Sequence, residues 1–415
     1  MYSIAFEGLD GAGKSTLIEL VERDLQNAWS VRRQKLGPLV LAKFRAFAQQ
    51  KLGDGDRYED LFDSGFRNRL YVTEGAVDDV YRRAHPTDEI VLRDRWIDTL
   101  RAYSDLALDD AGGQIFAQRV DHSDLTFYLD VSVDTALQRL VQSEDWLLKR
   151  LGVSGTASLL RRLADKYSGI YAARDDAVYL DAEASPETSR AKVLQVIQAR
   201  GPRTEPVSAS SPAPADVKRV AIEGIDGSGK STLVNELTSW MGKACGGRTF
   251  AEASRDIFKA AVGGGPDASS RLRQSFSSSL RQQSYAIDAL VQLKTDLPGS
   301  PRVQIFDRWM PAFNRMRGEI AHHAEFFDYL VDGLPQPDLL IVLDINPSVA
   351  ADRLVARSDW MIAQHGREKS VELLTAMRAA PLRLSGVPTC YIDAAQPPGR
   401  ILAEVQEFVR AHGIH

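Results

Sequence analysis

Short apolar runs alternate with amphipathic stretches along the chain, and the alternation occurs in both halves. Eight runs have the length and apolar content of buried strands: Ser3–Phe6, Glu89–Leu92, Leu125–Leu129, Ala177–Leu180, Arg219–Ile222, Val303–Phe306, Leu339–Leu343 and Thr389–Ile392. Four longer stretches carry apolar residues at helical spacing: Thr16–Leu25, Glu187–Ala199, Thr232–Met241 and Arg400–Ala411. Strands separated by helices predict an α/β fold, with a parallel sheet flanked by helices on both faces.

The same landmarks occur twice, in the same order and at a nearly constant distance. Four segments of the first half return in the second: Phe6–Leu17 as Ile222–Leu233, Asp94–Trp96 as Asp307–Trp309, Arg139–Val141 as Arg353–Val355, and Leu180–Ala182 as Ile392–Ala394. Ordered repetition at a fixed period is the signature of a duplicated unit. The sequence therefore predicts one sheet-and-helix domain repeated in tandem.

A segment without apolar periodicity separates the two repeats. Residues 201–216 are rich in proline, serine and alanine, a composition typical of flexible or partly extended linkers. We therefore expect a first domain over residues 1–200, a linker over 201–216 and a second domain over 217–415. Each domain has the size of an ordinary α/β domain.

Composition narrows the class of protein. Hydrophobic residues make up 44% of the 415 residues, charged residues 26%, and the net charge is −5, so no overall basic field favours nucleic acid or membrane surfaces. The two cysteines, Cys245 and Cys390, have no metal-ligand spacing. No apolar run approaches the roughly 20 residues of a membrane span, and an apolar strand begins at Tyr2. We expect a cytoplasmic protein with no membrane partner.

Each glycine-rich segment has the pattern of a P-loop, Gly-x-x-x-x-Gly-Lys-Ser, between a strand and a helix. Glycines let backbone N–H groups surround a phosphate, and the helix presents its positive end to it. The phosphate-binding residues expected from this pattern are Gly11, Gly13, Lys14, Ser15, Thr16, Gly227, Gly229, Lys230, Ser231 and Thr232. The lysines are candidate catalytic residues, and the pattern predicts ATP and Mg²⁺ as ligands.

An Asp-Arg pair follows a later strand in each half and supplies what the P-loop lacks. Asp94 and Asp307 close strands that we expect beside the P-loop strands, where a carboxylate can hold Mg²⁺ or orient an acceptor. The adjacent Arg95 and Arg308 can pair with an acceptor phosphate. Both pairs are candidate catalytic residues. The predicted metal ligands are Ser15, Asp94, Ser231 and Asp307.

These segments together resemble thymidylate kinases, in the P-loop, in the Asp-Arg-aromatic triplet and in the later strands around Leu125 and Leu339. The resemblance covers most of each half and implies a P-loop NTPase-type sheet, duplicated in tandem. It implies that the P-loop carboxylates and an arginine on a later helix bind the acceptor: Asp10, Arg67, Asp226 and Arg281. It also implies a lid that supplies arginines, with Arg139, Arg150, Arg353 and Arg367 as candidates.

The acceptor side departs from the family pattern, so several readings stay open. The segments Lys35–Leu39 and Ala251–Arg255 do not match the family's Arg-Glu-Pro-Gly segment. We expect phosphoryl transfer to a small-molecule acceptor, dTMP or a related or modified nucleotide. One alternative is a kinase for the hydroxyl of a nucleoside or modified base, where DNA becomes a conceivable partner. In another alternative one repeat is catalytic and the other is its nucleotide-binding or structural partner. The two repeats would then pair as an internal pseudo-dimer, or the chain would form a homodimer.

Overall fold

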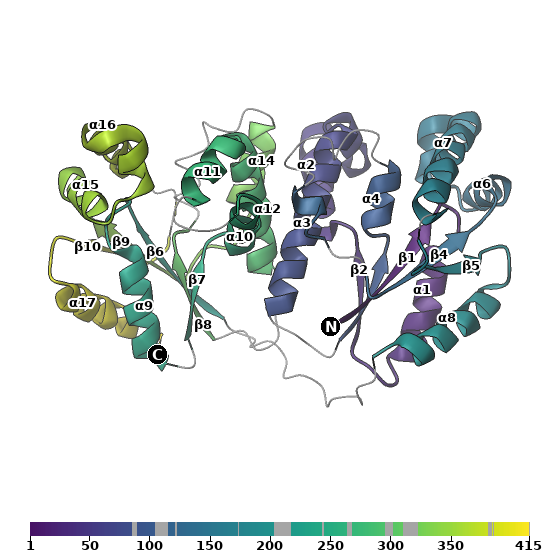
Figure 1. Cartoon of the computed structure of the whole chain (residues 1–415), viewed down its shortest axis with the longest axis horizontal. Helices are drawn as coiled ribbons and strands as arrows, with labels where there is room; N and C mark the ends of the chain where they lie inside the picture. Colours follow the sequence, from purple (N-terminus) through teal and green to yellow (C-terminus); the bar gives the residue numbers. More distant parts are fainter. Residues whose placement is uncertain are drawn as a thin grey trace. The chain divides into compact units, whose positions relative to one another are not determined.

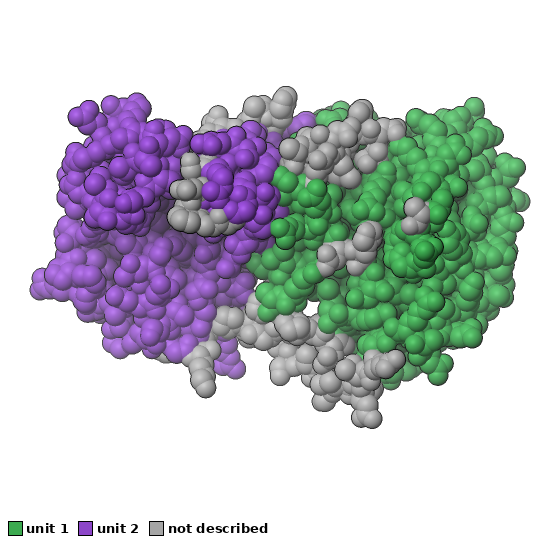
Figure 2. All heavy atoms as spheres, in the orientation of Figure 1, with its two compact units in different colours: residues 1–211 green, residues 212–415 purple. Residues whose placement is uncertain are grey.

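The chain forms two compact units, Met1–Ser211 and Pro212–His415 (Figure 2). The computed structural model describes residues 1–84, 89–103, 115–120, 123–172, 174–202, 217–242, 245–263, 268–294, 302–309, 323–380, 384 and 386–414, without the side chains of residues 269 and 270. The predicted linker lies outside the described residues from residue 203 onwards.

Unit 1 alternates strands and helices from its first residues (Figure 1). Its strands are β1 (Tyr2–Gly8), β2 (Val31–Lys35), β3 (Ile90–Asp94), β4 (Leu125–Asp130) and β5 (Val178–Asp181). Its helices are α1 (Lys14–Leu25), α2 (Pro38–Leu52), the 3-10 helix η1 (Gly55–Asp60), α3 (Ser64–Ala84), α4 (Ile97–Tyr103), α6 (Val133–Gln142), α7 (Trp146–Ala172) and α8 (Pro186–Arg200).

Unit 2 repeats this alternation. Its strands are β6 (Lys218–Gly224), β7 (Cys245–Thr249), β8 (Val303–Asp307), β9 (Leu339–Asp344) and β10 (Thr389–Asp393). Its helices are α9 (Lys230–Met241), α10 (Glu252–Ala261), α11 (Ala268–Ser275), α12 (Ser278–Lys294), α14 (Ala324–Asp332), α15 (Pro347–Ala356), α16 (Trp360–Ala379) and α17 (Pro398–Ala411).

Both sheets are parallel and share one strand order. Unit 1 runs β2-β3-β1-β4-β5, and unit 2 runs β7-β8-β6-β9-β10, so the P-loop strand is central in each. Alternate side chains of β1 leave the sheet on opposite faces. Phe6 belongs to the apolar core that includes Leu17 and Ile18 of α1, whereas Glu7 bonds Thr99 of α4. The predicted α/β fold, a parallel sheet flanked by helices, is confirmed.

The register places the predicted Asp-Arg strands beside the P-loop strands. Phe6 pairs with Asp94, and Ile222 pairs with Asp307. The eight predicted strands are present, but the sequence analysis did not list β2 and β7, the fifth strand of each sheet. These are edge strands whose sequences, VRRQK and CGGRT, carry no apolar run. An edge strand contacts the sheet on one side only, so its residues need not be apolar.

None of the helices that the structure describes has the length and apolar content required to cross a membrane.

The two units fill one equivalent core position in opposite ways. In unit 1, Arg93 of β3 forms a buried ion pair of 2.7 Å with Asp79 of α3, and its guanidinium lies 3.5 Å from the centroid of the Trp96 ring. In unit 2 these positions hold the apolar residues Phe306 and Leu293, both buried. A buried ion pair loses the hydration of both charges, so an apolar pair of similar volume can stabilise the core equally well.

We expect Asp79→Leu or Arg93→Phe alone to destabilise unit 1 by about 3–5 kcal/mol, because each leaves one buried charge without its partner. The double variant recreates the apolar pair of unit 2, so its free energy of unfolding should return to within about 1 kcal/mol of the original value. Denaturant unfolding measures all four proteins, with the transition of unit 2 as an internal reference. A double variant as unstable as the two single losses added together would contradict this account.

Candidate functional site

A glycine-rich turn joins the P-loop strand to its helix in each unit. Gly11 adopts a φ of 82°, and a Cβ there would lie 2.4 Å from the carbonyl oxygen of Ala136. Gly227 repeats this arrangement, with a φ of 83° and a Cβ position 2.6 Å from the carbonyl oxygen of Ala350. Only glycine fits this conformation so close to another backbone. The helices that follow, α1 and α9, begin without a side-chain cap, so their first N–H groups can bind an anion.

The P-loop lysines are buried and fold back over their own loops. Lys14 Nζ donates to the carbonyl oxygens of Gly8 at 2.8 Å and Leu9 at 2.6 Å. Lys230 donates two equivalent bonds, of 3.0 and 2.9 Å, to carbonyls of its loop. Burial, together with the charge of Arg95, lowers the pKa of Lys14 to about 7, and burial lowers the pKa of Lys230 to about 8. A polyphosphate beside these amines would favour their charged form.

A hydroxyl and a carboxylate meet next to each lysine. Ser15 Oγ donates to Asp94 Oδ2 at 3.0 Å, and Ser231 donates to Asp307 in the same way. The four predicted metal ligands therefore form two pairs, one in each unit. Mg²⁺ prefers oxygen ligands and usually takes one or two from the protein, with water and substrate phosphates in the other positions. This pair of oxygen atoms fits that requirement.

The Asp-Arg arginines turn back over the P-loop and bind its carboxylate. Arg95 and Arg308 adopt left-handed φ values of 72° and 77°, and their guanidinium groups pair with Asp10 and Asp226 respectively. The Tyr103 hydroxyl donates to the other oxygen of Asp10. Burial opposes ionisation of Asp10, but the neighbouring cations hold its pKa below the usual range. Non-glycine residues rarely adopt such φ values, and they cluster at functional sites.

A buried carboxylate that the sequence analysis did not single out fixes these two loops together. Glu7 accepts a 2.7 Å bond from the backbone N–H of Trp96 and further bonds from Thr99. Glu223 accepts the same bond, also 2.7 Å, from the N–H of Trp309. Both glutamates are fully buried, and burial raises the pKa of Glu7 to about 7. The available sequence signal was a charged residue near the end of an otherwise apolar strand.

A second functional candidate was missed because it lies on an unpredicted strand. Arg33 of β2 places Nη2 3.3 Å from Asp94 Oδ2, so the carboxylate beside the P-loop has a further cationic partner in unit 1. The strand register gives Gly247 the equivalent place in β7. The two sites therefore differ in one charge at this point.

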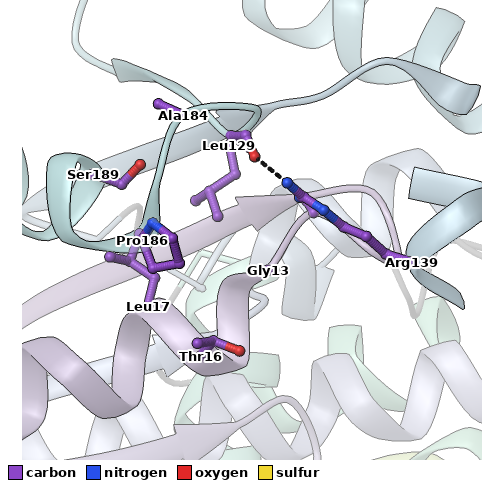
Figure 3. A pocket seen from close by; sticks show the side chains of 10 residues that line it. Gly13, Thr16, Leu17, Leu129, Arg139, Ala184, Pro186 and Ser189 are labelled. Atoms are coloured by element: carbon purple, nitrogen blue, oxygen red, sulfur yellow. Dashed lines mark hydrogen bonds between the residues drawn. The ribbon is translucent and has the colours of Figure 1, made fainter. Parts of the chain in front are cut away.

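Arg139 and Arg353 lie against the P-loop backbone. Arg139 donates to the carbonyls of Gly11 at 3.4 Å and Ala182 at 2.9 Å, and Arg353 makes both equivalent bonds at the same distances. Arg139 lines a pocket of about 210 Å³ (Figure 3). The pocket is bounded by Ala12, Gly13, Thr16, Leu17, Leu129, Arg139, Ala182, Ala184, Pro186 and Ser189. This pocket is a small, mainly apolar hollow beside the P-loop.

Two other predicted arginines of unit 1 meet on one carboxylate. Arg67, on α3, has Nη2 3.3 Å from Glu59 Oε1, and Arg150 of α7 pairs with the other oxygen of Glu59. Arg67 also donates to the carbonyl of Phe62 at 2.9 Å. The candidate acceptor and lid arginines are thus brought together, by a residue of η1 that the sequence analysis did not name.

Unit 2 places its predicted acceptor and lid arginines differently. Arg281 is buried on α12 and donates to the carbonyl of Phe276 at 3.3 Å, as Arg67 does to Phe62. Arg367 pairs with Asp352 at 2.7 Å, and both side chains are about half exposed. That contact joins α16 to α15, within the predicted lid itself.

Comparison with known proteins gives the family. The thymidylate kinase family model matches residues 6–193. A probable thymidylate kinase of Pyrobaculum aerophilum is 29% identical over 204 residues, covering 46% of this chain and 95% of the relative. The thymidylate kinase of Lactobacillus helveticus is 31% identical over 151 residues, covering 34% of this chain and 68% of the relative.

Among solved structures, deoxyadenosine kinase from M. mycoides with bound dCTP aligns with a TM-score of 0.33 and 15% identity, over 48% of this chain and 99% of that one. The family match lies within unit 1, so membership of unit 2 in the same family stays a prediction, which the shared strand order fits. With this match and the relatives' identity, the chain belongs to the thymidylate kinase family and is a nucleotide kinase.

Proposed function

We propose that unit 1 transfers the terminal phosphoryl group of ATP to a nucleoside monophosphate, dTMP or a related or modified nucleotide. The observation that carries this proposal is the convergence of Lys14, the Ser15–Asp94 pair and the Asp10–Arg95 pair at the carboxyl ends of β1 and β3. Ligands of parallel α/β sheets bind at this edge. The names of the curated relatives support the choice of acceptor.

Each group has a role that follows from its position. The N–H groups at the start of α1 and the Lys14 amine would hold the donor phosphates, and the pocket beside Arg139 would hold the donor base. Mg²⁺, when bound by Ser15 and Asp94, would neutralise phosphate charge. Asp10 and Arg95 would orient the acceptor.

Phosphoryl transfer asks the protein mainly for positioning and charge neutralisation. An acceptor that is already a phosphate needs no strong base, and the site's cations suit that requirement. Closure of the lid helices α6 and α7 would exclude water and so prevent simple hydrolysis of ATP.

We extend the proposal to unit 2, where Asp226, Lys230, Ser231, Asp307 and Arg308 would take the same roles. Support comes from the equivalent φ values, hydrogen bonds and strand order. Gly247 stands at the position of Arg33, so Asp307 lacks the counterpart of the arginine that contacts Asp94 in unit 1. A cytoplasmic location remains a prediction.

We expect the purified chain to convert ATP and dTMP to ADP and dTDP, and we expect the double variant Lys14→Ala/Lys230→Ala to reduce that rate at least a hundredfold, because each lysine stabilises charge in transfer. Chromatography of products from a panel of nucleosides, nucleotides and DNA measures the reaction, and the single variants Lys14→Ala and Lys230→Ala give the contribution of each unit. Exclusive phosphorylation of a hydroxyl would overturn the choice of acceptor. Full activity in both single variants would overturn the role of the P-loops.

We expect Gly11→Ala and Gly227→Ala each to weaken binding of ATP with Mg²⁺ at its own unit more than tenfold. The added Cβ would clash with a backbone carbonyl oxygen 2.4 or 2.6 Å away, and a residue with a Cβ is strained at this positive φ. Gly169→Ala is the matched control, because a Cβ on that helical residue meets nothing within 4 Å. Calorimetry should show one of two binding events lost in each P-loop variant. Two unchanged events in Gly11→Ala would refute this model of the loop.

A further inference from the structure

The two units carry opposite charges at one position that contacts the lid helix. This helix is α7 in unit 1 and α16 in unit 2. In unit 1 this position is Glu59, whose carboxylate contacts both Arg67 and Arg150. In unit 2 the residue 214 positions later is Arg273. Its guanidinium lies 3.4 Å from the centroid of the Trp360 ring, at the start of the lid helix α16.

Contacts on either side establish that these two positions are equivalent. Arg67 donates to the carbonyl of the residue five positions earlier, Phe62, and Arg281 donates in the same way to Phe276. The lid helices α7 and α16 also correspond, because both start at a tryptophan and both are kinked at a glycine with positive φ. Glu59 in unit 1 and Arg273 in unit 2 therefore both face the lid helix, and their charges have opposite signs.

The change of charge extends to the lid and to the P-loop. At the four equivalent positions unit 1 has Glu59, Arg67, Ser143 and Arg150, and unit 2 has Arg273, Arg281, Arg357 and Gln364. Unit 1 thus combines two cations with one anion, whereas unit 2 has three cations. Arg357 also pairs with Asp359 at 2.9 Å. Asp359 has a counterpart in Asp145 of unit 1, whereas Arg357 replaces the uncharged Ser143, so the two units differ here by one positive charge.

The added cations act on the P-loop carboxylate of unit 2. Burial opposes ionisation of Asp226, yet the charges of Arg308, Lys230, Arg273 and Arg357 together lower its pKa to about 2. In unit 1 the largest effects of this kind on Asp10 come from Arg95 and Lys14. The charges of Arg273 and Arg357 therefore favour the ionised form of the P-loop carboxylate in unit 2, and the geometric evidence for their place beside the lid is the contact of Arg273 with Trp360.

We propose that residue 59 or 273 sets the phosphate charge of the nucleotide that each unit accepts opposite ATP. Glu59 occupies two arginines of unit 1 and restricts it to a nucleoside monophosphate. Arg273, with Arg281 and Arg357, gives unit 2 a subsite for a nucleotide with at least one more phosphate, a nucleoside diphosphate. This inference rests on the proposed function, because it concerns the acceptor side of the same site.

The physical reason is the electrostatic cost of placing phosphate near a carboxylate. A second phosphate group beside Glu59 would bring like charges together at a largely buried point, where water screens them weakly. An arginine at the same point offers a planar pair of donors that fits phosphate oxygens. Charge reversal at one position can therefore both exclude and attract, which is how specificity between similar ligands is usually achieved.

The test uses the full chain with the donor sites filled by the β,γ-imido analogue of ATP and Mg²⁺, so that calorimetry reports the acceptor sites. The probes are dTMP and dTDP. We expect Arg273→Glu to weaken dTDP binding at least tenfold while dTMP binding changes less than twofold. We expect Glu59→Arg to create a second dTDP site of comparable affinity.

Three controls make the result interpretable. Arg400→Glu reverses an exposed charge on α17 and should leave binding of both probes unchanged. Arg273→Gln and Glu59→Gln remove charge without reversing it and should give intermediate effects. Thermal unfolding of each variant shows whether the fold persists; if Arg273→Glu unfolds, Arg273→Gln alone decides the matter.

Unchanged dTDP binding in the folded Arg273 variants, or equal losses for dTMP and dTDP, would overturn the inference. That outcome is distinct from failure of the proposed function. If the chain phosphorylates dTMP but Arg273→Glu leaves dTDP binding intact, only the assignment of the subsite is wrong. If the original chain binds neither probe and forms no dTDP from dTMP, the proposed function itself is wrong.

Discussion

A buried carboxylate near the end of the central strand holds together the two loops that carry the candidate catalytic residues. The side chain of Glu7 is buried, and its carboxylate accepts a hydrogen bond from the backbone N–H of Trp96, which directly follows Arg95. That bond, with the left-handed φ of Arg95, turns the guanidinium towards Asp10 in the P-loop. A buried carboxylate without donors would be costly, so the donors of this segment must stay in place. Glu223 imposes the same constraint in unit 2.

The two units share one strand order, so their sites can be compared position by position. The atoms that we expect to bind phosphate are arranged alike: a buried lysine on loop carbonyls, a serine bonded to the strand-end aspartate, and an arginine paired with the P-loop carboxylate. Differences lie around that centre. Asp79 and Arg93 become Leu293 and Phe306 in the core, and Glu59 becomes Arg273 opposite the lid. The donor side has kept its geometry while the surroundings have changed.

Sequence patterns predicted the central strands of each sheet well and the edge strands poorly. The central strands are apolar because both faces are covered, so periodicity identifies them. The edge strands β2 and β7 lack that signal, and Arg33 was missed with them. Glu59 was missed for another reason. It lies in a short 3-10 segment with no motif, and only the folded chain brings it to Arg150, 91 residues away.

The sequence by itself determined the parts whose information is local. Spacing within Gly8–Thr16 encodes the turn, the helix start and the lysine, because neighbouring backbone atoms build the predicted phosphate site. Tertiary structure alone decided which distant side chains lie close enough to form ion pairs and hydrogen bonds. The pairs Arg95–Asp10, Ser15–Asp94 and Glu59–Arg150 arise from strand order and helix packing, which set distances that no spacing along the chain contains. Electrostatic interactions depend on those distances and on burial, so the charge of each site emerges only in the folded unit.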